Sequence, residues 1–179
     1  MRSLLRLSAL IDAINARLGL IANWMVLTSC LISAGNAMVR YTFDTSSNAW
    51  LEIQWYMFGV MFMLGASYTL NRNEHVRVDI IYGNVPERVQ LWIDLIGGIL
   101  FLMPAVIILC WLSWPMFLES YRIGEESSNA GGLLRWPIKL VLPIGFFFLA
   151  LQGISEIIKR IAALQGRIQI ESKYEKPLQ

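Results

Sequence analysis

The sequence is poor in the residues that carry most protein chemistry. It has a single histidine, His75, and two cysteines, Cys30 and Cys110, which lack a metal-binding spacing such as C-x-x-C. One histidine cannot supply the pair of axial ligands that a haem held between membrane helices commonly uses. A phosphate-binding GxxxxGK(S/T) loop and an HExxH zinc motif are also missing. These absences predict that the chain is not an enzyme and has no catalytic, cofactor-binding or metal site.

Charged residues are scarce as well. They make up 16% of the 179 residues, against about 25% in ordinary soluble domains, while 56% of the residues are hydrophobic. The apolar residues gather in long blocks and do not alternate with polar ones, which indicates lipid as the solvent of the fold. The net charge of +2 comes without a basic patch, so no nucleic-acid partner is expected.

Four apolar blocks approach the roughly 20 residues that a spanning helix needs. They predict an all-α integral membrane protein with spans at about residues 18–39, 53–71, 95–118 and 138–156. The fourth is the marginal one, because it spans only if Lys139 and Glu156 reach out to the headgroups. In the first block, Asn23 and Asn36 are expected to form hydrogen bonds between helices. Residues 1–160 would form one membrane domain, with residues 161–179 as a cytoplasmic tail.

The distribution of basic residues predicts the orientation. Eleven of the fifteen Lys and Arg lie before the first block, between the second and third, or after the fourth, and four lie on the other side. Because Lys and Arg concentrate on the cytoplasmic side, both termini are expected in the cytoplasm.

Two segments beside the spans have the pattern of amphipathic helices. Residues 3–17 carry apolar side chains at spacings of three and four, which predicts a helix on the inner membrane surface before the chain turns into the first span. Pro86 suits the first turn of a second, horizontal helix that leads into the third span. Simple anchoring at the interface and binding of a partner both remain open for these segments.

Particular residues add a family resemblance. The segment YTFDTSSNAWLEIQWYMFGVMFMLGASYTLNRNEHVRVDIIYG, residues 41–83, resembles the small membrane subunit of tripartite ATP-independent periplasmic (TRAP) transporters. Its characteristic parts are Glu52 with Trp55, and the loop that contains His75, Arg77 and Asp79. A second segment, GEESSNAGGLLRWPIKLVLPIGFFFLALQG, residues 124–153, is similar to the same family.

The resemblance implies a role that spacing alone does not show. The chain would be a non-catalytic small permease subunit in the bacterial cytoplasmic (inner) membrane, bracing a large multi-span permease that works with a periplasmic solute-binding protein. The complex would import an organic acid by symport with sodium, and the large subunit would hold both the organic acid and the sodium ion. Two alternatives stay open: a membrane anchor subunit of a redox complex, and an independent small transporter or channel.

The sequence suggests two sets of functional positions in this framework. The first set would contact the large subunit or order a loop: Glu52, Trp55, Arg72, His75, Arg77 and Asp79. The second set would meet anionic headgroups of membrane lipid at the inner surface: Arg72, Arg77 and Arg88. Charges at span ends also set the depth of a helix in the membrane, which is the simpler explanation for each.

Overall fold

The fold is helical throughout the part of the chain that the structure, a computed structural model, describes: residues 1–74 and 85–169. The helices are α1 (Arg2–Phe43), α2 (Asn48–Asn71), α4 (Glu87–Gly97), the π-helical segment η1 (Gly98–Leu102), α5 (Met103–Arg122) and α6 (Trp136–Leu164). The all-α prediction is therefore confirmed for these residues.

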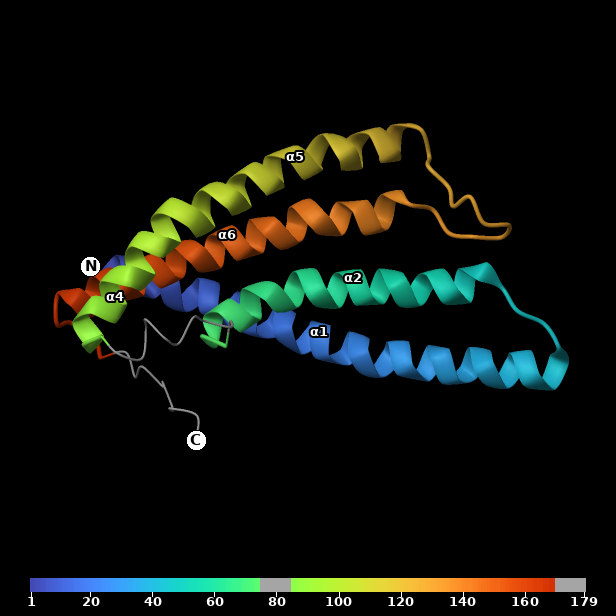
Figure 1. Cartoon of the computed structure of the whole chain (residues 1–179), viewed down its shortest axis with the longest axis horizontal. Helices are drawn as coiled ribbons and strands as arrows, with labels where there is room; N and C mark the ends of the chain where they lie inside the picture. The colour runs from blue at the N-terminus through green and yellow to red at the C-terminus, as the bar shows by residue number, and fades with distance from the viewer. Residues whose placement is uncertain (75–84, 170–179) are drawn as a thin grey trace.

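The long helices lie side by side in a layer, in the order α5, α6, α2, α1 (Figure 1). At one end α1 also packs against α6, so that α1, α2 and α6 meet there. This end holds the N-terminus, and the α1–α2 and α5–α6 connections lie at the other (Figure 1). Following the predicted orientation, we call these the inner end and the outer end.

Among the described residues, three helices are long and apolar enough to cross a membrane: α1, the continuous helix Glu87–Arg122, and α6. The marginal fourth block therefore lies in one of the strongest candidates. The second block forms α2, which has 24 residues but is not among the three. A crossing by α2, and with it four spans and cytoplasmic termini, stays a prediction.

Two predicted breaks between helices are absent. Residues 3–17 run into the first apolar block as one helix, α1, without the expected turn. Likewise α4 continues through η1 into α5. Pro104 explains the π-helical turn at η1, because the proline ring would clash with the carbonyl group of Leu100 in a regular α-helix. The surface position of residues 3–17 stays a prediction.

The first half of α1 buries its small and polar side chains. Leu4, Leu7 and Leu10 are each about half exposed. The residues of α1 that are buried against its neighbours are Ser8, Ile11, Asn15, Gly19 and Ala22. Polar groups gain most from an interior that can bond them, while apolar side chains lose nothing by facing lipid. The buried face of this part of α1 is therefore made mostly of small and polar residues, with Ile11 as its large apolar member.

Glycines allow the closest approaches between helices. A Cβ atom at Gly19 of α1 would overlap the Tyr68 ring of α2. One at Gly145 of α6 would lie 2.6 Å from the Cβ atom of Met63 in α2. Such contacts are typical of helix pairs in membranes, where close packing replaces the hydrophobic effect as the driving force.

Candidate functional site

The first candidate site surrounds Glu52 at the outer end. We define this outer cluster as Glu52, Ser127, Asn129, Leu133 and Arg135. Although charged, Glu52 is only 2% exposed. Its carboxylate accepts hydrogen bonds from Ser127 Oγ, from Asn129 Nδ2 at 2.9 Å and from Leu133 N at 2.7 Å. Arg135 Nη2 lies 3.7 Å from Glu52 Oε1. Three donors and a nearby cation favour the ionised carboxylate, which stabilises the charge in this buried place.

The loop between α5 and α6 folds back on itself over this carboxylate. Ser127 N donates to Leu133 O at 3.0 Å, within a short antiparallel pairing. Gly131 has a φ of 69°, in the region that glycine adopts without strain. At Gly132, a Cβ atom would lie 2.9 Å from Glu52 Oε1, so only glycine lets the loop backbone come this close. The loop is therefore shaped to enclose the side chain of Glu52.

Two further contacts hold the ends of this loop. Tyr56 Oη, one turn beyond Glu52 in α2, donates to Leu134 O at 2.7 Å. Lys139 Nζ at the start of α6 donates to Glu125, and this ammonium group holds the pKa of the Glu125 carboxyl below its ordinary value. The outer cluster thus fastens the α5–α6 connection to α2, although α2 and α5 do not adjoin in the layer.

The second candidate site is a buried network at the inner end. We define this inner cluster as Ser8, Asp12, Asn15, Asp94, Gln152, Ser155, Glu156, Lys159 and Arg160. At its centre Asn15 and Gln152 are fully buried, and Asn15 Nδ2 donates to Gln152 Oε1 at 2.7 Å. Gln152 Nε2 donates to Asp12 Oδ1 at 2.8 Å and to Glu156 Oε1 at 3.1 Å. Ser155 Oγ donates to the same Asp12 oxygen at 2.7 Å.

The charged part of the inner cluster joins three helices. Lys159 of α6 pairs with Asp12 of α1 at 3.2 Å and with Glu156. Arg160 Nη1 lies 2.7 Å from Glu156 Oε2, and its Nε lies 3.1 Å from Asp94 Oδ2 in α4. Glu156 is only 9% exposed, so its carboxylate is bonded within the protein, and its depth relative to the headgroups stays a prediction. Its two cationic partners and the Gln152 amide keep it inside the protein.

The residues selected from the sequence do not form one site. Glu52 lies at the outer end, whereas Arg72 ends α2 at the inner end, with its guanidinium 5.4 Å from the centre of the Tyr68 ring. Trp55 is 68% exposed on α2, and Arg88 is exposed near the start of α4. Three of the selected residues lie outside the described part of the chain: His75, Arg77 and Asp79.

Sequence reasoning missed the inner cluster. A signal was available, because polar side chains recur at helical spacing on one face of each of two helices: Ser8, Asp12 and Asn15 in α1, and Gln152, Ser155, Glu156 and Lys159 in α6. Each stripe borders an apolar block, and charged residues at the ends of such blocks are predicted to lie at the membrane surface. Only the packing of α1 against α6 shows that the two stripes face each other.

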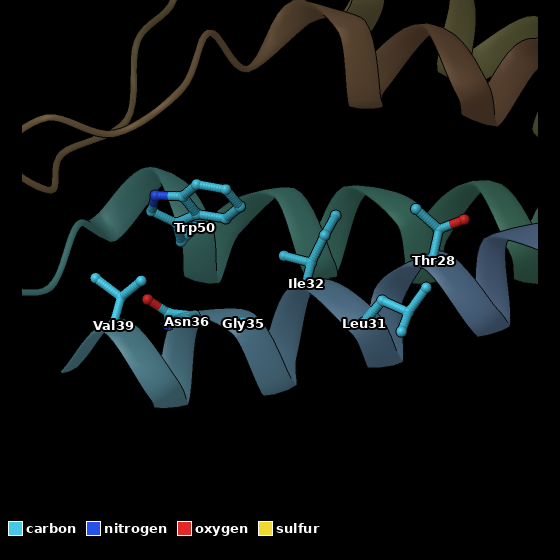
Figure 2. Close-up of a pocket in the computed structure, with 7 residues that line it drawn as sticks. All are labelled: Thr28, Leu31, Ile32, Gly35, Asn36, Val39 and Trp50. Carbon is cyan, nitrogen blue, oxygen red and sulfur yellow. The ribbon is translucent and has the colours of Figure 1, made fainter. Parts of the chain in front are cut away.

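An apolar groove with a volume of about 330 Å³ lies between the outer halves of α1 and α2. Figure 2 shows its lining, in which Val39 and Asn36 of α1 lie nearest to Trp50 of α2, and Ile32 and Thr28 follow farther along α1. The Thr28 hydroxyl group already donates to the Trp24 carbonyl group at 2.8 Å. The groove can therefore accept an apolar group, and it lies apart from both polar clusters.

The contacts within both clusters indicate a structural role. Their carboxylates are occupied by donors from other helices, from the loop or, at Glu156, from the same helix, and neither cluster opens into the groove. Within residues 1–74 and 85–169, no group of three or more His, Cys, Asp or Glu side chains could hold a metal ion. The geometry points to connections that hold the helix layer together at both of its ends.

Comparison with known proteins provides a family. Residues 29–163 match the family described as "Tripartite ATP-independent periplasmic transporters, DctQ component". The match includes the whole outer cluster and the α6 side of the inner cluster, up to Arg160. A search of curated proteins finds no match to the chain.

Proposed function

The chain belongs to the DctQ component family of TRAP transporters, and from this premise we propose that it braces the large permease subunit without moving solute itself. Members of this family are small permease subunits, components of a transporter. The proposal adds that this subunit is a rigid support in the membrane, that it has no catalytic function, and that the solute and the coupling ion bind to the large subunit.

One observation carries the proposal: the helices form an open layer that is fastened at both ends. At the outer end Glu52 ties α2 to the α5–α6 loop, and at the inner end Arg160 ties α6 to α4. Between these ends α1 and α5, the two edge helices of the layer, carry many exposed apolar side chains. A layer of this kind can be both stiff and wide, which suits a support that lies against a larger membrane protein.

The finer parts of the proposal come from the family and from the charge pattern. We place the protein in the bacterial inner membrane with both termini in the cytoplasm, because the basic residues concentrate on the side that holds them. The partners would be the large permease and a periplasmic solute-binding protein. The transported solute would be an organic acid and the coupling ion sodium. The family match gives no support to the alternative of a redox anchor.

The selected residues receive different roles in this proposal. Glu52 orders the outer loop from a buried position and is screened from direct contact with a partner. Trp55 is exposed and available for subunit contact. Arg72 and Arg88 are exposed at the inner end, where anionic lipid headgroups would attract them. For His75, Arg77 and Asp79 a role in subunit contact or loop structure stays a proposal.

Reconstitution into liposomes tests this division of labour. We expect no solute uptake by this chain alone, and uptake when the large permease, the solute-binding protein and a sodium gradient are also present. The large permease without this chain should transport far less, because its support is missing. Uptake by this chain alone would contradict the proposal and favour an independent transporter. Equal uptake by the large permease with and without this chain would also contradict it.

A further inference from the structure

One face of α1 has a repeat that the packing of the chain does not use. We define the α1 seam as Ala16, Leu20, Asn23, Leu27, Cys30 and Ala34. These residues follow one another at alternating spacings of four and three, and all six are exposed. That spacing is the heptad pattern by which one helix packs along another at a small crossing angle. The seam is thus shaped for a helix that the chain itself does not provide.

Asn23 places an exposed polar side chain in this otherwise weakly polar face. It lies five residues beyond Leu18, the start of the predicted first span, which is roughly 7 Å into the hydrocarbon at ~1.5 Å per residue. The predicted hydrogen bond from Asn23 to another helix of the chain is absent, because within the described residues its amide has no partner. Lipid tails offer no donor or acceptor, so an amide exposed to them is unfavourable.

We propose that the α1 seam packs against a transmembrane helix of the large permease, with a polar side chain of that helix hydrogen-bonded to Asn23. This inference rests on the proposed function. Ala16, Cys30 and Ala34 would let the two backbones approach, and Leu20 and Leu27 would fill the holes between them. A single Asn within a heptad seam also sets the register of the two helices.

The other exposed face of α1 fits this partner less well. The groove toward α2 is lined by Thr28, Ile32 and Val39, and the Thr28 hydroxyl group is already bonded within α1. Ile21 lies on that side, six residues from Leu27 and so about 120° away around the helix axis at ~100° per residue. Because Ile21 is 45% exposed and Leu27 is 48% exposed, the two form a matched pair for locating the partner.

Photo-crosslinking in the assembled complex tests the position of the seam. A benzophenone amino acid replaces either Leu27 or Ile21, and the chain is co-expressed with the large permease and illuminated in its membranes. We expect a covalent adduct with the large permease from position 27, in several-fold higher yield than from position 21. A higher yield from position 21, or an adduct from position 27 that contains only a second copy of this chain, would overturn the inference.

A pair of variants tests the hydrogen bond. Asn23→Leu should weaken the association with the large permease between about threefold and tenfold, the range of single interhelical hydrogen bonds in membranes. Thr28→Val should leave it unchanged. If the complex forms but both variants assemble like the natural chain, the inference fails while the proposed function stands. If the natural chain forms no complex with the permease, the proposed function itself fails.

Discussion

Replacing Arg160 with alanine is expected to prevent the protein from folding stably. The guanidinium group bonds to Glu156 at 2.7 Å and to Asp94 at 3.1 Å, and all three side chains are largely buried. Breaking a buried ion pair by removing one partner costs about 3–5 kcal/mol. A typical domain has only about 5–15 kcal/mol of stability in total. We therefore expect a large fall in the unfolding temperature measured in detergent, and a low yield of monodisperse protein.

Two further variants show whether this loss is specific to the contacts of Arg160. Arg160→Lys keeps the charge but cannot bond both carboxylates with the same fork of donors, so we expect an intermediate unfolding temperature. Arg167→Ala removes a guanidinium of equal charge that is exposed just beyond α6, and it should behave like the natural chain. An unfolding temperature of Arg160→Ala equal to that of Arg167→Ala would contradict the structural role of the inner cluster.

Replacing Glu52 with alanine is expected to release the outer loop. The change removes the acceptor that Ser127, Asn129 and Leu133 share, and it leaves three donors of part-buried hydrogen bonds without that partner. A loop that opens more often is cut faster by proteases, because cleavage follows the population of the open form. Trypsin added from the outer side should therefore cleave next to Arg135 roughly tenfold faster or more.

The same loop provides the control for this measurement. Glu126→Ala removes an equal charge from an exposed position of the loop, and its cleavage rate should not change. Glu52→Gln keeps the size of the side chain but loses one acceptor oxygen and the charge opposite Arg135, so its rate should fall between the two. If Glu52→Ala were cut no faster than Glu126→Ala, the loop would not depend on Glu52.

Composition and charge-free blocks were sufficient to predict the helical class. The family that the residues around Glu52 and Trp55 resemble was confirmed by the family match. Block length was a weaker guide to the spans. The marginal fourth block became part of α6, because a helix extends through charged residues when ion pairs neutralise them, as Lys159 and Arg160 of the same helix do at Glu156. The second block formed a helix of 24 residues that is not among the candidate spans.

The polar clusters could not be predicted from the sequence alone, because they depend on contacts between segments that are distant along the chain. Glu52 was selected as a functional position, but its partners follow it by about 75–80 residues. Asp12 and Glu156 were each placed at a membrane surface, since a single amphipathic pattern cannot show which of its faces another helix will cover. The polar stripes on α1 and α6 acquire a meaning only when the two helices are set against each other.

The most direct test of the support role is affinity purification of this chain from its native membranes in mild detergent, with mass spectrometry of the proteins that accompany it. The account predicts that a large multi-span permease accompanies the chain in near-equal amount. Recovery of the chain with redox subunits, or with no partner at all, would contradict the account.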